Sequence, residues 1–415
     1  MIYKRHLMLL AAGLLASICT AATSESAAET PGNQKLRQLM EQRRAAIAAA
    51  AGQAAGYASA TGPTPARLQE RADLLAQGET ALSRLEVDKA LLAFDKAALI
   101  LHAADTEIAL VRTYMQGGEY RRALAFGAHT AGAHLDVVAG SALYAWLLHM
   151  GGQPAIAQRL LGEADARVPG NAVLKSVQTQ LRSAAPLASA GMLLVPTRLA
   201  PYSSTARLPV NVRIAGSGLL LQDGKRALAP LSQLPVSGQI WMRNGLGQMS
   251  EAKIEKRLPE LGIALLRLKK PLPVPANIEV QNTPAFPGSI GFTVEYAAAP
   301  HALPAWPILR SGFLGNFSAN GTDRKLGIDM PPGARGGPVF DGAGRLAGIA
   351  VQGKPGEADL FTSSGQLNQA LQKTTAAGAK SGLGAIAPAG AAQRASVDLI
   401  YENSLKLTLQ VITAH

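Results

Sequence analysis

The spacing of apolar residues changes near residue 190, and this change limits the chain to folds with two unlike parts. From Ala66 to Ser183, apolar residues recur at helical spacing, which predicts amphipathic helices. After Met192, short Val-, Ile- and Leu-rich runs with near-alternation are separated by Gly, Pro and Asn, as in barrels and sandwiches. A chain of 415 residues is also too long for one ordinary core. We therefore predict a multidomain α + β protein, helical over residues 66–185 and all-β over residues 192–373.

Short glycine- and proline-containing turns divide the helical part into units of similar length. Three segments align on Ala90, Ala123 and Ala155, which follow one another at nearly equal intervals. This period, with two helices in each unit, resembles that of tetratricopeptide repeats, whose unit is about 34 residues. The resemblance implies that the small residues let paired helices approach, while Phe94 and Leu160 fill the groove between hairpins. A generic helical bundle is the alternative.

A repeat array of this kind ends in a cap and presents one face to partners. Leu174 to Leu181 is the expected cap helix. The concave face of a helical solenoid suits an extended peptide or a partner's helix. Tyr114, Tyr120 and Arg121 are candidates for that face, although aromatic residues at helical spacing are also typical of a core.

The glycine-rich run Gly-Ala-Arg-Gly-Gly-Pro at residues 333–338 is the most specific motif of the second part. It resembles the nucleophile loop of trypsin-like serine proteases of the HtrA type, which reads Gly-x-Ser-Gly-Gly-Pro. Gly333, Gly336 and Gly337 match the glycines that shape an oxyanion hole in that family. Arg335 stands at the serine position, and a guanidinium cannot attack a carbonyl. Pairing of Arg335 with Asp329 or Asp341, which would plug the pocket, is as plausible as recruitment of a ligand carboxylate.

Two upstream segments match the same family in the same order. After Gly-Ser-Gly at residues 216–218, the run Ala-Pro-Leu-Ser at 229–232 places Ser232, or Leu231 if the register slips, at the histidine position. Gly262 stands at the aspartate position of a strand-like run at 260–268. The resemblance therefore implies a trypsin-like double β-barrel whose triad positions are degenerate and which has no general base. His301, one of two histidines beyond residue 190, is expected in an exposed loop.

Residues 1–22 have the composition of a secretory signal peptide. Lys4 and Arg5 precede an apolar stretch from Leu7 to Ile18, and small residues follow at the expected cleavage zone. The apolar run is too short to span a bilayer, so a mature chain without a transmembrane segment is predicted. Cys19, the single cysteine, suggests lipidation as an alternative, but the bulky Ile18 before it disfavours a lipoprotein signal.

The remaining segments are predicted from composition. Residues 23–65 form a polar and Ala-rich segment, with a possible helix at 34–51 and a linker at 52–65. Residues 374–395 form an Ala/Gly-rich linker. Residues 396–415 are expected to form a short helix followed by a strand. A barrel edge is a candidate partner for this strand.

The net charge of +12 comes mainly from the second part, where Lys and Arg outnumber Asp and Glu by 22 to 13 from residue 195 onward. A basic surface favours anionic partners such as envelope lipids or acidic proteins, although it is also typical of a simple solvated surface. No nucleic-acid recognition motif is present, so nucleic acid is not an expected partner. Dispersed histidines and the absence of known motifs predict no metal and no cofactor.

The leading hypothesis is a catalytically inactive protease homologue in the bacterial periplasm, which holds a protein or peptide partner as a scaffold or assembly factor. Barrels of this kind bind an extended chain by adding it to a sheet edge. The prediction on activity is therefore that the chain is not an enzyme. The alternatives are a serine endopeptidase with a noncanonical site, and adhesion to anionic envelope components.

Overall fold

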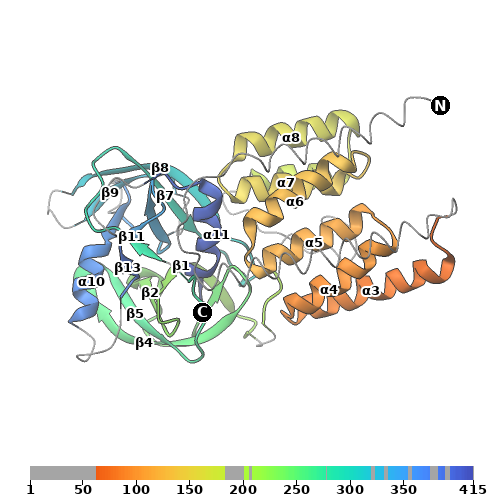
Figure 1. The fold of residues 1–415 in the computed structure, drawn as a ribbon. Coiled ribbons are helices and arrows are strands. Elements are labelled where there is room, and N and C mark those ends of the chain that lie inside the picture. Colours follow the sequence, from red (N-terminus) through yellow and green to blue (C-terminus); the bar gives the residue numbers. More distant parts are fainter. Residues whose placement is uncertain are drawn as a thin grey trace, which may run out of the picture. The chain divides into compact units, whose positions relative to one another are not determined.

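The computed structural model describes residues 62–182, 201–204, 208–276, 278–318, 323–330, 335–353, 358–373, 382–387 and 393–414. The predicted signal peptide, residues 23–61 and the glycine Gly333 lie outside the described residues. Within the described part, a run of helices precedes two β-barrels, coloured orange to yellow and then green to blue in Figure 1. The predicted fold class is confirmed.

The helical module consists of three antiparallel hairpins and a closing helix. Pro65 and Pro154 occupy the first helical turn of their helices, where a missing N–H costs nothing. Gly118 ends α5 in the left-handed conformation that favours glycine. The closing helix begins at Ala172, slightly before the predicted start. The helices are α3 (Pro65–Ser83), α4 (Val87–Ile100), α5 (Ala104–Gly117), α6 (Tyr120–Ala133), α7 (Val138–Met150), α8 (Pro154–Arg167) and α9 (Ala172–Leu181).

The helices recur with the predicted period, but the third alignment was displaced by half a turn. The second helices of the hairpins begin at nearly equal intervals, and the fourth residue of each is a fully buried alanine: Ala90, Ala123 and Ala157. Ala155 is exposed. Leu161, rather than the half-buried Leu160, takes the buried position that Phe94 has in α4. The corrected period fits tetratricopeptide repeats, and membership of that class remains a prediction.

The first barrel is a closed ring of six strands in the order β1-β14-β3-β4-β5-β2. The predicted runs at 210–214 and 218–221 form one strand, β1, which is bent by an irregularity between Ile214 and Gly216. Apolar residues such as Leu220, Met242 and Leu266 form its core. The strands are β1 (Val212–Leu220), β2 (Arg226–Pro230), β3 (Ile240–Asn244), β4 (Met249–Leu258), β5 (Ile263–Leu268) and β14 (Thr408–Ala414).

The second barrel closes where β10 pairs with both β7 and β11, and two short strands extend its sheet beyond β11. The outermost, β13, lies inside the segment that composition predicted as linker. The helix α10 (Ser364–Gln372), which was not predicted from the sequence, begins with a capping box formed by Ser363 and Gln366. The strands are β6 (Glu279–Val280), β7 (Ser289–Glu295), β8 (Ile308–Phe317), β9 (Arg324–Gly327), β10 (Pro338–Asp341), β11 (Leu346–Val351), β12 (Leu360–Ser363) and β13 (Ala385–Ile386).

The C-terminal strand β14 is an integral member of the first barrel. It pairs antiparallel with β1 on one side and β3 on the other, so it fills a central position instead of extending an edge. The helix before it, α11 (Val397–Leu407), begins after the capping residue Ser396, close to the predicted start. The C-terminal segment therefore closes a barrel whose first strand begins at Val212.

Residues 63–415 form one compact unit, and contacts between the helices and the barrels are part of it. Tyr120 at the start of α6 packs edge-on against Tyr401 of α11, with ring centroids 4.4 Å apart. The amide of Gln116 donates to the carbonyls of Tyr202 and Leu246, the second of which precedes β4. Among the described helices, none has the length and apolar character required to cross a bilayer.

Candidate functional site

The three segments predicted to hold the triad positions meet in the structure. Ser232 lies in the short 3-10 helix η1 (Leu231–Gln233), whose first N–H, from Leu231, donates to the carbonyl of Gly262 at 2.8 Å. The side-chain amide of Gln233 in the same helix donates to the carbonyl of Arg335 at 2.5 Å. The segments that contain Ser232, Gly262 and Arg335 therefore contact one another, as expected from the order of the motifs.

The Arg335 guanidinium is held by a carboxylate that no sequence motif indicated. Its Nε lies 2.8 Å from Asp359 Oδ1 and its Nη2 lies 2.6 Å from Asp359 Oδ2, a bidentate ion pair. The two side chains are only 12% and 15% exposed. Asp359 thus takes the place predicted for Asp329 or Asp341, and Asp341 accepts from the amides of the β10–β11 turn. Of the two roles considered for Arg335, an internal ion pair is the one that this geometry favours.

A second contact between an arginine and a carboxyl group lies close to the first. The Glu295 side chain at the end of β7 is 1% exposed, and its Oε1 lies 3.1 Å from Arg310 Nε on β8. Burial raises the pKa of Glu295 to about 8, although the positive charges of Arg310 and Arg335 lower it. Glu295, a carboxyl group with a pKa near neutral pH, therefore lies beside the Arg335–Asp359 pair.

The glycines after Arg335 are used to fix the loop to the barrel. The Gly336 N–H donates to the carbonyl of Ala350 at 2.9 Å, and the Gly337 carbonyl accepts from the N–H of Ala350 at 3.0 Å. Gly336 has a φ of +94°, and a Cβ there would lie 1.9 Å from the carbonyl oxygen of Ser217. The Gly336 amide thus has an internal acceptor on β11, and the binding role expected for Gly336 and Gly337 stays a prediction.

The hydroxyl of Ser217 connects the two barrels behind this loop. It accepts from the N–H of Tyr296 at 2.6 Å and donates to the carbonyl of Tyr296 at 3.1 Å. The Ser217 N–H donates to the carbonyl of Arg335 at 2.9 Å. Since Ser217 is fully buried on β1 and Tyr296 follows β7, the position of the Arg335 loop is set by both barrels.

The candidates on the helical module are not all at its surface. Tyr114 and Tyr120 are 3% and 0% exposed, so they belong to the core, which is the alternative typical of aromatic residues at helical spacing. The Tyr120 hydroxyl donates to the carbonyl of Leu147 at 3.0 Å. Arg121 has a half-exposed side chain, and its Nη2 lies 3.0 Å from Glu402 Oε1 on α11. Arg121 therefore joins the helices to the barrels instead of presenting a free recognition group.

The polar groups that sequence reasoning missed are Asp359, Glu295, Arg310 and Gln233. Their partners lie on other strands or loops, so no local motif indicates any of these contacts. A weak signal was present at Glu295, which is a charged residue inside the apolar run of β7. A charge within a buried strand normally requires a partner of opposite charge.

Comparisons with known proteins give fold-level similarity only. Neither the protein-family models nor the curated proteins contain a match. One similar solved structure is the inactive form of the Rv3671c protease, 15% identical, covering 40% of this chain and 89% of that chain with a TM-score of 0.32. Another is a serine endoprotease from Yersinia pestis, also 15% identical, covering 40% of this chain and 62% of that chain with a TM-score of 0.31.

The prediction that the chain is not an enzyme is contradicted by these similarities, because both structures are of proteases. The prediction depended on which residues stand at three motif positions. Three residues at motif positions do not by themselves establish inactivity, because a catalytic site is defined by its geometry and not by sequence position. The similarity itself extends to the protease fold and no further.

Proposed function

We propose that this chain is a protein-binding scaffold of the bacterial cell envelope whose helical module holds an acidic, partly apolar segment of a partner protein. The observation that carries the proposal is a surface hollow of about 460 Å³ on the first hairpin, between α3 and α4. Helical hairpin modules commonly bind peptides or helices in such grooves, with apolar side chains as anchors.

The hollow combines an apolar floor with a basic rim. Leu92 is 57% exposed there, an exposure that suits an anchor point for a partner's apolar side chain. Among the charged residues that line the hollow, Glu86 and Lys89 form an ion pair at 3.0 Å, so their charges cancel. Arg84 and Lys96 remain, and they make the net charge of the hollow positive. The lining residues are Leu74, Ala76, Gln77, Thr80, Ala81, Arg84, Glu86, Lys89, Leu92, Ala93 and Lys96.

Charge favours an external partner over the chain's own N-terminal segment. Residues 34–51 contain four basic residues and a single acidic one, so they match the basic rim poorly. A partner segment with carboxylates beside leucine- or phenylalanine-sized side chains would match both the rim and the floor. The expected occupant is therefore an acidic amphipathic helix or extended peptide of another protein.

The barrels offer less room for a partner strand than the family resemblance implied. Both rings are closed, and the free edge seen among the described strands is the short β13. Addition of a peptide to a sheet edge requires a longer row of unpaired backbone groups. In this proposal the barrels therefore support and orient the helical module, to which Tyr401 and Glu402 of α11 attach them.

Location in the envelope is supported by the composition of residues 1–22, which has the features of a secretory signal. We propose a periplasmic location for the mature chain. Cell fractionation with an antibody against the barrels tests this, and recovery of the intact chain with cytoplasmic markers would contradict it.

The binding proposal is tested by capture of the tagged chain from the envelope of its host, beside the variants Leu92→Ser and Lys96→Glu. Both variants alter the hollow at exposed positions, so loss of the same partner without loss of folding is the expected result. Leu135→Ser is the matched control, because Leu135 is 51% exposed on the same module but outside the hollow. Retention of every partner by both hollow variants would refute the proposal.

Two further experiments test the alternative functions, adhesion to envelope lipids and peptide hydrolysis. Pelleting with anionic vesicles across salt concentrations measures adhesion to envelope lipids, which falls as salt screens the charge. Incubation with unfolded casein and a serine-directed fluorophosphonate probe measures peptidase activity. Covalent labelling of a serine in the purified chain would assign hydrolysis to the barrels in addition to binding by the helices.

A further inference from the structure

The helical module gathers three histidines around one buried carboxylate. Along the sequence these histidines are dispersed, since each lies in a different turn or helix end between residues 102 and 134. The fold brings them together: His102 lies in the α4–α5 connection, His129 on α6 and His134 at the end of α6, and all face Glu107 in the first turn of α5.

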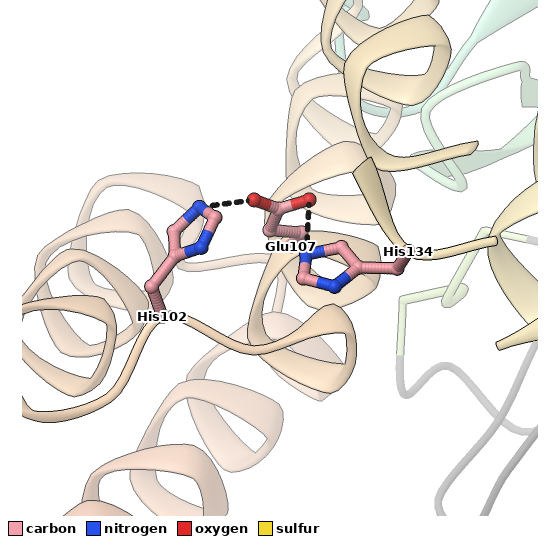
Figure 2. Close-up of side chains that lie close together, drawn as sticks. All are labelled: His102, Glu107 and His134. Atoms are coloured by element: carbon pink, nitrogen blue, oxygen red, sulfur yellow. Dashed lines mark ion pairs between the residues drawn. The ribbon is translucent and has the colours of Figure 1, made fainter. Parts of the chain in front are cut away.

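Figure 2 shows two of the imidazole rings on either side of the Glu107 carboxylate, each with a nitrogen directed at a carboxylate oxygen. His102 Nε2 lies 2.5 Å from Glu107 Oε1, and His134 Nε2 lies 3.4 Å from Glu107 Oε2. One ligand atom from each of these three residues lies within 4.8 Å of the others. His129 Nε2 is 3.5 Å from Glu107 Oε1 and completes the cluster.

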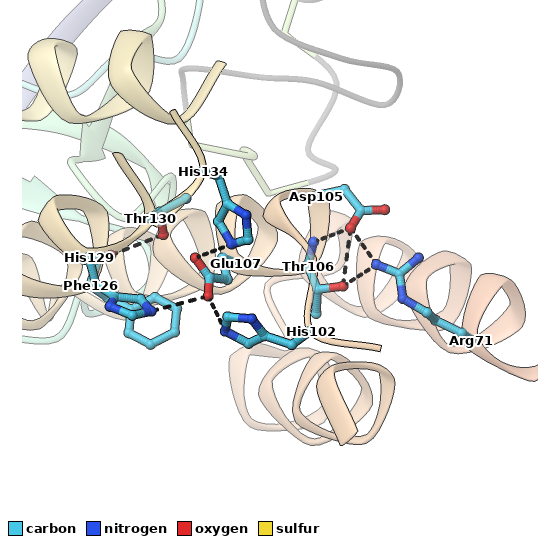
Figure 3. A network of polar contacts seen from close by, with 9 residues as sticks. All are labelled: Arg71, His102, Asp105, Thr106, Glu107, Phe126, His129, Thr130 and His134. Atoms are coloured by element: carbon cyan, nitrogen blue, oxygen red, sulfur yellow. Dashed lines mark hydrogen bonds and ion pairs between the residues drawn. The ribbon is translucent and has the colours of Figure 1, made fainter. Parts of the chain in front are cut away.

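Apart from these imidazole contacts, the carboxylate at the centre has no partner among the described residues that donates a hydrogen bond to it. The Glu107 side chain is 2% exposed, and neither of its oxygens has a hydrogen bond; His134 Nε2 is buried without a hydrogen bond as well. Buried polar atoms are almost always hydrogen-bonded or bound to an ion. The neighbouring Arg71 does not satisfy them, because its guanidinium donates to Asp105 and Thr106, as Figure 3 shows.

Imidazole nitrogens combined with a carboxylate are the ligand set of zinc and related transition metals, whereas magnesium and calcium prefer oxygen ligands alone. Bonds of about 2.0–2.1 Å in a tetrahedral arrangement place two ligand atoms roughly 3.4 Å apart. The distance from Glu107 Oε2 to His134 Nε2 is 3.4 Å and that from Glu107 Oε1 to His129 Nε2 is 3.5 Å, so each carboxylate oxygen has one imidazole nitrogen at that separation. The shorter contact with His102 would lengthen as an ion entered, and the 61% exposure of the His102 side chain leaves solvent-filled space for that shift.

We propose that His102, Glu107 and His134 bind a divalent zinc-type ion, with His129 as the nearest side chain for the fourth position. The two most exposed histidines, His102 and His129, open the cluster to solvent, so an ion can reach it from the surface. Bound there, the ion would connect the α4–α5 loop, the start of α5 and the end of α6. Its role would be to fix the first hairpin to the second and so to stabilise the module.

The experiment uses the purified full chain, stripped with a chelator and then dialysed against Zn²⁺. We expect about one zinc per chain to be retained and the Tm of unfolding to rise, because an ion that binds only the folded state stabilises it. Mg²⁺ at the same concentration should have no effect. Co²⁺ provides a spectroscopic check, since four-coordinate Co²⁺ absorbs visible light much more strongly, and at longer wavelength, than octahedral aqueous Co²⁺.

Variants assign the ligands. Glu107→Gln keeps the size of the side chain, and His134→Asn keeps a polar group; each should weaken zinc retention by more than ~10-fold while the circular dichroism spectrum is unchanged. His129→Ala should weaken it less, because His129 is outside the group of three. His301→Ala in the barrel region is the matched control for an exposed histidine. No zinc retained by the wild-type chain, or retention that Glu107→Gln and His134→Asn both leave unchanged, would overturn the proposal.

Discussion

Glu295 shows how burial decides the chemistry of a single residue. Its neighbours Phe292 and Val294 on β7 belong to the apolar core, and its carboxylate contacts Arg310, but burial outweighs that contact and raises the pKa to about 8. In an unfolded chain the same group titrates near its ordinary value of 4.5. The folded chain therefore binds more protons than the unfolded chain between these two values, so its stability must fall as the pH rises through that window.

We predict that the free energy of unfolding decreases from pH about 4.5 to pH about 8 by on the order of a few kcal/mol because of this group. Glu295→Gln removes the titrating proton, so it should flatten that part of the profile. Urea unfolding at a series of pH values measures the effect. Glu251→Gln, at a surface ion pair with Lys269, serves as the control. Parallel profiles for wild type and Glu295→Gln would contradict the prediction.

Of the two glycines that the structure describes after Arg335, Gly336 leaves the less room for a side chain. Its φ of +94° and the approach of an added Cβ to 1.9 Å from the Ser217 carbonyl combine strain with a backbone clash. We predict that Gly336→Ala lowers the free energy of unfolding by about 3 kcal/mol or more. Gly262→Ala is the matched control: its φ is +64° but nothing lies within 4 Å, so only about 1–2 kcal/mol of strain is expected. A calorimetric or urea comparison of the two variants measures this, and equal losses would show that the clash is relieved by movement of the loop.

At the scale of the helices, the recurrence of small buried residues sets the hairpin geometry. Ala90, Ala123 and Ala157 occupy the fourth position of α4, α6 and α8, where the side chain is fully buried. Residues 154–157 contain two alanines, Ala155 and Ala157, and either fits the period of the sequence. Only the start of α8 shows which of the alanines faces its partner helix.

We predict that Ala157→Leu destabilises the module by about 1–3 kcal/mol, because a leucine does not fit between packed helices. Ala155→Leu, on the exposed face of the same helix, should change stability by less than about 0.5 kcal/mol. Thermal unfolding followed by far-ultraviolet circular dichroism, which reports the helical signal, measures both. If Ala155→Leu were the more damaging of the two, the register given by the structure would be incorrect.

On the scale of the whole molecule, α11 joins the helices to the barrels. Tyr401 is fully buried, packs against Tyr120 and donates its hydroxyl to the carbonyl of Pro307 at 2.7 Å. The strand that follows α11 closes the first barrel, so one segment contributes to both parts of the fold. This continuity explains why residues 63–415 form a single compact unit.

We predict that helices and barrels unfold in one calorimetric transition in the wild-type chain. Tyr401→Ala removes about 3–5 kcal/mol of packing and should separate the transition into two. Arg121→Ala, which deletes the half-exposed ion pair with Glu402, should cost at most about 1 kcal/mol and preserve the single transition. Two transitions in the wild type, or one in Tyr401→Ala, would contradict this view of α11.

The sequence by itself determined the local features of this protein. The period of apolar residues specified the helices before residue 183 and most of the strands after residue 192, since side-chain direction in each element follows its own repeat, whereas the helix α10 was not indicated. Glycine-rich turns and capping residues specified where several elements begin. The order of three family-like motifs was sufficient to place Ser232, Gly262 and Arg335 on segments that meet.

Tertiary structure alone decided the contacts between distant segments. Nothing near Arg335 in sequence indicated Asp359, and nothing near Glu107 indicated that His102 and His134 would approach it from different turns. The insertion of β14 between β1 and β3 likewise depends on which backbone groups remain unpaired after the other strands have formed. Periodicity fixes the face that a residue occupies on its own helix or strand, whereas its partner across the core is selected by the packing of the complete chain.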